Sequence, residues 1–153
     1  MRHSNPEPEA EMDAAAADLQ RTLNLLLPIR RQRLSRSERQ QREQEQALRV
    51  VTEKTAETEQ RLASRQEEYQ QLRQAFVQKN RGVKQAKYRL ERALEQEQQA
   101  QQQVDDERLS LHQLALARRE QQQRVEQAQQ ETRLRLREME KLEYLLQQQE
   151  ITG

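Results

Sequence analysis

Apolar residues recur along most of the chain with the seven-residue period of a coiled coil. A first column of the repeat begins at Leu27, and a second, weaker column lies three residues after each of its members. Columns spaced alternately by three and four residues form a seam along one side of an α-helix, and a sustained heptad gives a left-handed supercoil. The first column comprises Leu27, Leu34, Gln41, Leu48, Thr55, Leu62, Tyr69, Phe76, Val83, Leu90, Glu97, Val104, Leu111, Arg118, Val125, Thr132, Met139 and Leu146. The pattern predicts a long coiled coil, weakened where Gln41, Glu97 and Arg118 occupy seam positions.

The start of the chain breaks this pattern. Residues 1–12 contain two prolines and a cluster of acids, and they are expected to form a disordered acidic tail. The first long helix is expected over residues 13–80, with Asp13 as a cap or first-turn acid. A kink or a restart is expected near Pro28, because proline removes one backbone hydrogen bond and clashes with the preceding turn.

One internal turn signal lies almost midway along the helical region. Asn80 and Gly82 can adopt the left-handed backbone conformation that ends a helix, so a turn is expected at residues 79–82 and a second long helix at 83–150. The expected fold is all-α, a long antiparallel two-helix coiled-coil hairpin. The alternative is an unbroken helix that pairs with a second chain, because the heptad phase passes through this turn without a slip. A glycine inside a helix costs only about 1 kcal/mol.

The composition of the 153 residues agrees with long helices. Charged residues make up 35% of the chain, aromatic residues 3% and apolar residues 33%, against roughly 45–50% apolar in globular domains. Large apolar side chains are too scarce to build a compact core. Gln, Glu, Arg, Ala and Leu dominate instead, and these residues favour helix. A coiled coil is therefore expected rather than a globular or a disordered chain.

Candidate catalytic residues are sparse. The chain has no cysteine and only two glycines, which excludes thiol nucleophiles, disulfide frameworks and glycine-rich phosphate loops. His3 lies in the expected tail, and His112 has no second histidine or cysteine nearby with which to bind a metal ion. We therefore expect no enzymatic activity, no metal and no cofactor. The start lacks the apolar core of a signal peptide, and no apolar run exceeds four residues, so we expect a soluble intracellular protein without direct membrane insertion.

Charge is segregated along the chain, although the net charge is only +1. Residues 1–20 contain one arginine and five acids, a net charge of −4. Residues 30–42 and 79–92 each contain six basic residues and one glutamate, a net charge of +5. In a hairpin the first basic block lies near both termini, beside the arginines of residues 133–137, and the second lies at the turn. Each block is either a solvated helix face or a docking site for an acidic surface.

The residues also bear on two other kinds of partner, nucleic acid and a further helix. Nucleic acid is acidic, but residues 30–47 contain no asparagine to pair with an adenine and no base-reading pattern, so nucleic-acid binding is not expected. Leu109 and Leu116 fall opposite the main seam. They could begin a second apolar seam for a partner, although scattered exposed leucines are common in proteins.

Two short stretches resemble a known family. Residues 25–39 open with a leucine run, continue with Arg30-Arg31 and end with Arg36-Ser37-Glu38-Arg39. Residues 140–145 read Glu-Lys-Leu-Glu-Tyr-Leu. Both stretches, together with the chain length and the heptad pattern, resemble the type III secretion stalk proteins, the SctO/YscO group related to flagellar FliJ. Members of that group fold as antiparallel two-helix coiled coils.

The resemblance implies a non-enzymatic central stalk at the cytoplasmic face of a bacterial type III protein secretion apparatus. The end with the termini would insert into the hexameric export ATPase, the turn end would reach the export-gate ring protein, and secretion chaperones are further implied partners. The implied ATPase-binding residues are Arg30, Arg31, Arg33, Arg36, Arg133 and Arg137. The implied export-gate residues are Tyr69, Phe76, Arg81, Lys84 and Tyr88, of which the first two also belong to the seam. The alternative function is that of a generic parallel dimeric coiled-coil scaffold.

Overall fold

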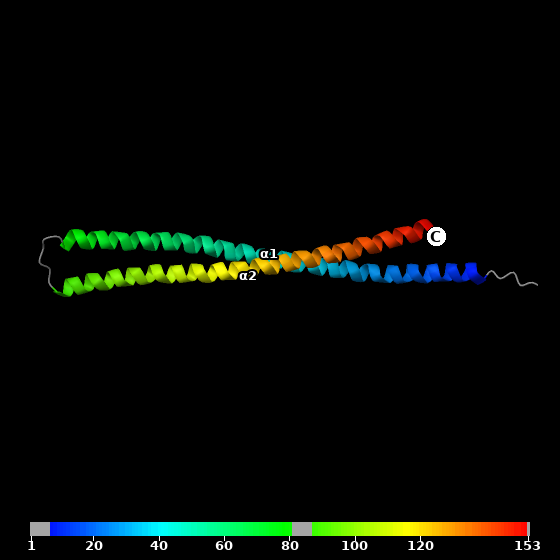
Figure 1. The fold of residues 1–153 in the computed structure, drawn as a ribbon, viewed down its shortest axis with the longest axis horizontal. Helices are drawn as coiled ribbons and strands as arrows, with labels where there is room; N and C mark the ends of the chain where they lie inside the picture. Colours follow the sequence, from blue (N-terminus) through cyan, green and yellow to red (C-terminus); the bar gives the residue numbers. More distant parts are fainter. Residues whose placement is uncertain (1–6, 81–86, 153) are drawn as a thin grey trace, which may run out of the picture. The chain divides into compact units, whose positions relative to one another are not determined.

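The structure, a computed structural model, describes residues 7–80 and 87–152. All of them belong to two α-helices, α1 (Glu7–Asn80) and α2 (Lys87–Thr152), and no strand occurs within these ranges (Figure 1). The expected all-α class is therefore confirmed. Neither helix, within the same ranges, has a stretch long and apolar enough to cross a membrane.

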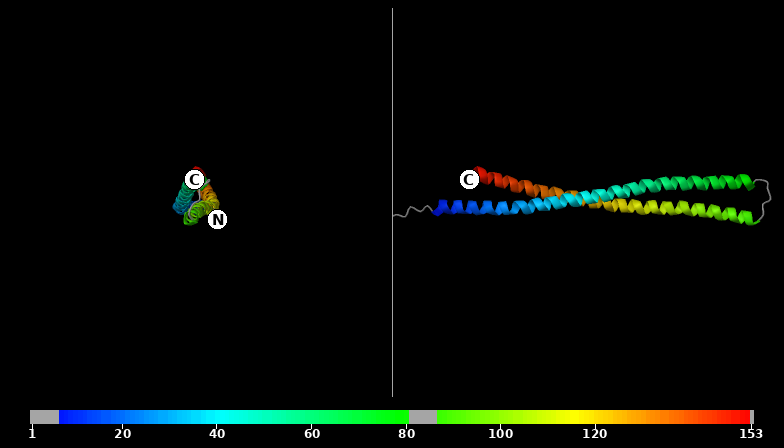
Figure 2. Two further views of the ribbon diagram at one scale, coloured as in Figure 1. Left: turned by 90° about the vertical axis from the view of Figure 1, so that its left-hand side faces the viewer. Right: turned by 180° about the vertical axis from the view of Figure 1, so that it is seen from behind.

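The chain divides into two compact units, which are described separately. Unit 1 comprises Met1–Glu45 and Arg124–Gly153, and unit 2 comprises Gln46–Gln123. In each unit a segment of α1 lies alongside a segment of α2, as the two opposite views show (Figures 1 and 2). Both helices contribute to both units, so each unit is a pair of helices with its own stretch of seam.

Contacts between the helices show that they are antiparallel. In unit 2 the guanidinium Nε of Arg61 lies 3.4 Å from Glu107 Oε1, and that of Arg73 lies 3.9 Å from Glu97 Oε1. A later position on α1 thus meets an earlier position on α2. In unit 1 Arg30 reaches the main chain of Glu138, whereas Gln41 lines a groove with Gln129 and Thr132. The expected antiparallel two-helix hairpin is confirmed, with pairing within one chain.

The core lies in the two heptad columns. Leu142 is completely buried in unit 1. All buried apolar residues except Leu23 fall in the columns identified from the sequence, and Leu23 extends the second column by one heptad toward the N-terminus. The buried apolar residues are Leu23, Val125, Met139 and Leu142 in unit 1, and Ala100 and Val104 in unit 2. Burial at alternating spacings of three and four is the geometry of a coiled-coil seam.

Polar residues share the seam. Ser37, Thr58 and Gln121 are buried in the second column. The Thr58 hydroxyl donates to the Lys54 carbonyl at 2.8 Å and accepts from Arg61 Nη2 at 2.9 Å, so the buried hydroxyl has partners on its own helix. Satisfied polar groups of this kind cost far less than unpaired ones, but they add little apolar burial. The seam therefore mixes apolar layers with polar ones.

The three polar residues that interrupt the first column differ in the exposure of their side chains. Gln41 and Glu97 are half-buried, as expected for seam positions. Arg118 is exposed, so its assignment to the core is wrong for its side chain. A long cationic side chain can keep its stem near the helix pair while its guanidinium reaches water, which avoids the cost of burying a charge.

The N-terminal boundary of α1 differs from the expectation. The helix begins at Glu7, so residues 7–12 of the expected disordered tail are helical, and residues 1–6 lie outside the described part of the chain. The acids of the first turns favour this start, because negative charge is stabilising near a helix N-terminus. Pro8 is tolerated there because the first N–H groups have no helical partner.

α1 also continues through Pro28, so the restart considered there does not occur. Proline leaves the carbonyl of Asn24, one turn earlier, without its helical donor. Asn24 and Pro28 are both exposed, so water can satisfy that carbonyl. The proline therefore interrupts one hydrogen bond without ending the helix.

The expected turn falls partly on α1 and partly outside the described residues. α1 ends at Asn80, the expected last residue of the first helix, and it includes Lys79 and Asn80 of the expected turn. Arg81 and Gly82, the other two residues of the expected turn, lie outside the described residues. α2 is described from Lys87 rather than from residue 83, and it ends at Thr152 rather than at 150.

Candidate functional site

The six arginines expected to bind an ATPase all lie in unit 1. Four come from residues 30–36 of α1 and two from residues 133–137 of α2. These segments lie alongside each other, because Arg30 contacts Glu138 at one end of the stretch while Gln41 and Arg133 line one groove at the other. We call this set the arginine cluster: Arg30, Arg31, Arg33, Arg36, Arg133 and Arg137.

Members of the arginine cluster have two different environments. Arg31, Arg33 and Arg36 on α1, like both members on α2, are exposed. Arg30 is half-buried, and its Nη1 donates to the Glu138 carbonyl at 2.9 Å. Arg30 therefore belongs to the contact between the two helices. The other five arginines of the cluster lie on the surface, where they can meet an acidic partner.

Arg135 is a further arginine of this region that the sequence interpretation did not include among the binding residues. It is half-buried at a second-column seam position. Its Nη1 lies 3.3 Å from Glu138 Oε2, and its Nη2 lies 3.7 Å from Glu131 Oε1. Its charge is thus directed at carboxylates of its own helix. The sequence could have indicated that Arg30 and Arg135 are partly buried, because both fall in the second heptad column.

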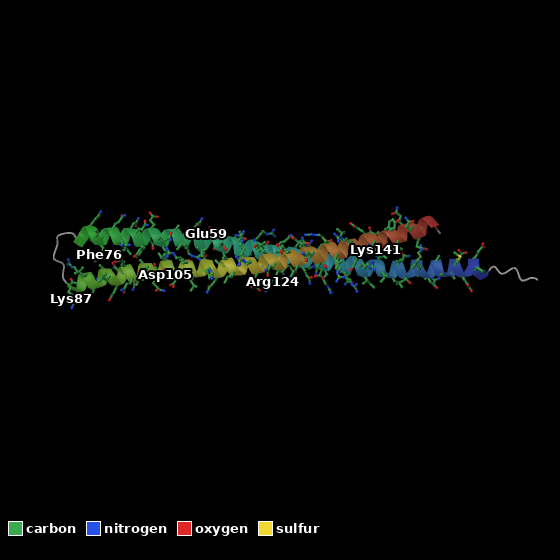
Figure 3. All side chains as sticks on the ribbon, in the orientation of Figure 1. Glu59, Phe76, Lys87, Asp105, Arg124 and Lys141 are labelled. Atoms are coloured by element: carbon green, nitrogen blue, oxygen red, sulfur yellow. The ribbon has the colours of Figure 1, made fainter. Side chains whose placement is uncertain are left out.

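The α2 side of the arginine cluster is shallow and partly apolar. Arg133 and Arg137 lie one helical turn apart and flank Leu134, which is exposed, in a groove open to solvent. Arg133 also lines the neighbouring groove with Leu136 and Gln41. Figure 3 labels Arg124 and Lys141, between which this stretch of α2 lies. An arrangement of guanidinium groups beside exposed leucine suits a protein surface that combines acidic and apolar side chains.

The residues expected to contact an export gate are only partly described. Tyr69 is half-buried, and the Arg73 guanidinium lies 6.0 Å from the centre of its ring, the range of a cation–π contact. Phe76, near the end of α1 (Figure 3), is also half-buried, whereas Tyr88 near the start of α2 is exposed. Arg81 and Lys84 lie outside the described residues. Tyr69 and Phe76 thus serve the seam of unit 2, and a gate contact by Tyr88 stays a prediction.

Metal-ligating side chains and the grooves of unit 2 are the other candidate sites among the described residues. No group of three or more His, Cys, Asp or Glu side chains among them is placed to hold a metal ion. His112 is exposed on α2. The grooves between the helices of unit 2 are open and are lined mainly by polar and charged side chains, such as Lys54, Glu57 and Arg61.

We compared the chain with protein-family models, with curated protein sequences and with solved structures, and none of them matched. The residues themselves are therefore the basis for inferring a function. Their most distinctive arrangement is the set of exposed arginines that the antiparallel pairing gathers from two distant parts of the chain.

Proposed function

We propose that the protein is the non-enzymatic central stalk of a bacterial type III protein secretion apparatus. It inserts into the hexameric export ATPase and links that ATPase to the export gate, at the cytoplasmic face of the apparatus. The observation that supports this proposal best is the arginine cluster: five exposed arginines from both helices, on the unit that contains both chain termini. The resemblance of residues 25–39 and 140–145 to the stalk family agrees with it.

The physical basis is electrostatic docking. Exposed guanidinium groups attract an acidic surface and speed the encounter, and they set the orientation of the complex more than its affinity. Each exposed pair contributes at most about 1 kcal/mol, so several arginines must act together. Binding of this kind weakens as added salt screens the charges.

The other basic block supports a second contact. Lys87, Arg89 and Arg92 at the start of α2 are exposed in unit 2, next to Tyr88. Under the proposal this segment meets the export-gate ring protein, with secretion chaperones as further partners. The same segment provides a matched control for the ATPase contact, because it has the same charge but lies in the other unit.

The test is charge reversal within the arginine cluster. Arg31, Arg33 and Arg36 are replaced together by glutamate, and Arg30 is kept because it joins the helices. We expect loss of binding to the purified hexameric secretion ATPase and loss of its stimulation, with an unchanged circular dichroism spectrum. Reversal of Lys87, Arg89 and Arg92 should preserve both. Equal loss from the two reversals would mean that neither block is a dedicated site and that both are solvated helix faces.

The alternative function, a generic parallel dimeric scaffold, makes opposite predictions. A scaffold would not stimulate the ATPase. In a parallel dimer, cysteines introduced singly at Val104 or Leu142 would cross-link to the same position of a second chain. The antiparallel pairing within one chain places Val104 beside α1 instead, so such homotypic cross-links are not expected from the hairpin.

A further inference from the structure

A second apolar stripe runs along the N-terminal part of α1. It starts at Met12 and continues with spacings of three and four residues, separate from Leu23, which is buried, and Leu27, which is half-buried. The stripe comprises Met12, Ala15, Leu19, Thr22, Leu26 and Ile29. Met12 is 72% exposed, and Leu19 and Ile29 are each 46% exposed. This regular spacing is that of a coiled-coil seam, and every member except the half-buried Leu26 is exposed.

The start of α1 has no helix beside it. Within unit 1, α1 extends past the end of α2 (Figures 1 and 2). Residues 8–16 are exposed without exception. Isolated helices gain little stability from propensity alone, and most helices in proteins are stabilised by packing of an apolar face. The overhanging turns of α1 therefore have an apolar face available for a further helix.

Charges at the two ends of the second stripe are opposite. Residues 7–18 carry five acids and no basic residue, and residues 30–36 carry four arginines and no acid. Glu9, Glu11 and Asp13 are exposed at the first end, as are Arg31, Arg33 and Arg36 at the second. A helix that complements these charges is basic where it covers residues 7–18 and acidic where it covers residues 30–36. The same segment of a second copy, turned end for end, has this charge order.

We infer that the second stripe is the interface of an antiparallel dimer between two copies of this chain. Centring the pairing between Leu19 and Thr22 places Met12 of one copy opposite Ile29 of the other. Glu9 and Glu11 then flank the contact near Arg33 of the second copy, which continues the stripe four residues after Ile29. The two-fold symmetry of such a dimer repeats each acid–base contact twice. A parallel pairing would instead bring like charges together, which is unfavourable.

The small side chains on the stripe favour close approach. Ala15 faces Leu26 in this register, and Thr22 faces Leu19, so the inner layers pair a small residue with a large one, while Met12 and Ile29 form the outer layers. Alternation of this kind fills the space between helices without voids. Pro28 does not belong to the stripe, so its ring does not interrupt the contact.

The dimer goes beyond the proposed function and can be tested without any secretion component. If the proposed function also holds, the two states exclude each other, because both cover Arg33. Addition of the ATPase would then release monomers from the dimer. A failure of that exchange would count against the stalk assignment, whereas the dimer itself is judged on the isolated chain.

The experiment measures the molar mass of the full chain by sedimentation equilibrium at low salt over a range of concentrations. We expect a rise from 18.4 kDa, the mass of one chain, toward twice that value. The double variant Leu19→Lys with Ile29→Lys should dissociate, because it places charges in the interface. The matched control, Leu109→Lys with Leu116→Lys, changes two leucines of α2 that are 57% and 53% exposed, and it should dimerise like the native chain.

Charge swapping tests the orientation. The triple change Glu9→Arg, Glu11→Arg and Asp13→Arg should weaken the dimer at least about tenfold, as should reversal of Arg31, Arg33 and Arg36 to glutamate. Combining both sets in one chain should restore dimerisation. A more stable α1 would not explain restored dimerisation. The combined variant still has arginines at the N-terminus of α1, where positive charge opposes the helix dipole.

Three results would overturn the inference. The first is a native chain that stays monomeric at all concentrations. The second is a lysine variant of the stripe that dimerises like the control. The third is a combined charge swap that fails to restore the dimer, which would point to a different orientation or a different surface.

Discussion

The guanidinium Nη1 of Arg30 donates a hydrogen bond of 2.9 Å to the main-chain carbonyl of Glu138, joining two positions 108 residues apart. The Glu138 side chain in turn lies 3.3 Å from Nη1 of Arg135. One glutamate thus meets a seam arginine from each helix. Arg30 and Arg135 thus differ from the exposed arginines of unit 1, which the proposed function assigns to docking.

The contact of Arg30 with Glu138 predicts different consequences for two neighbouring arginines. Arg30→Glu should lower the free energy of unfolding by about 1–3 kcal/mol, because it removes a charged donor and places a carboxylate beside a carbonyl and Glu138. Arg31→Glu changes an exposed side chain and should alter stability by no more than about 0.5 kcal/mol. Urea unfolding followed by circular dichroism measures both. Equal values for the two variants would contradict the role assigned to Arg30.

Leu142, which is completely buried, should be the most sensitive apolar position of unit 1. Leu142→Ala is expected to cost about 2–5 kcal/mol through lost burial and the cavity that remains. The matched control is Leu116→Ala, at a site 53% exposed, where the loss should be small. Thermal unfolding of both variants checks the heptad register. A larger effect at Leu116 would show that the seam has been assigned to the wrong face of α2.

Replacing polar seam residues should stabilise the hairpin. Gln41→Leu and Glu97→Leu each put an apolar side chain at a half-buried position, and each loses only a weak contact. Gln41 donates to Glu45 at 2.9 Å on its own helix, and Glu97 lies 3.9 Å from Arg73, which is largely exposed. We expect a gain of about 1 kcal/mol each, or about 2–4 °C in melting temperature. Calorimetry on the double variant tests this expectation.

Arg118→Leu serves as the comparison for that experiment. It occupies the same heptad column, but its side chain is exposed, so the substitution should raise the melting temperature less than either of the other two. A rise as large as that of Glu97→Leu would mean that the Arg118 side chain is part of the core in solution.

The antiparallel register can be read by cross-linking, because the chain has no cysteine of its own. Cysteines at Arg61 and Glu107 should be joined within one chain by a short bifunctional maleimide. The mismatched pair at Arg61 and Glu97 is displaced along α2 by ten residues, about 15 Å, and should react poorly. Mass spectrometry under dilute conditions separates links within a chain from links between chains. Preferential linkage of the mismatched pair would contradict the register.

Much of the fold follows from periodicity, which is a local property of the chain. Strong helix formers and a heptad that persists from Leu27 to Leu146 are sufficient to predict two long helices and the columns that bury Val104, Val125 and Met139. The sequence analysis did not predict the helix start at Glu7, because a proline-containing acidic segment resembles a disordered tail. Both features also suit a first helical turn: acids are stabilising there, and the N–H that proline lacks would have no helical partner.

The choice between a hairpin and a two-chain coiled coil could not be settled by the heptads, because both arrangements bury the same columns. The tertiary structure decided it by pairing Arg61 with Glu107 within one chain. A connecting turn keeps the second helix at high effective concentration, so pairing within the chain competes well with pairing between chains. Composition and spacing carry no information about that competition.

The sequence by itself determined the helical class, the seam and the presence of six arginines in two distant segments. Only the tertiary structure decided that those segments meet, that Arg30 belongs to the joint between the helices, and that Arg31, Arg33 and Arg36 remain exposed. The physical reason is that the sequence of one helix specifies which residues are cationic. The position of the other helix determines which of these residues can donate a hydrogen bond to one of its carbonyl groups. Burial is a property of the pair of helices, and no single segment contains it.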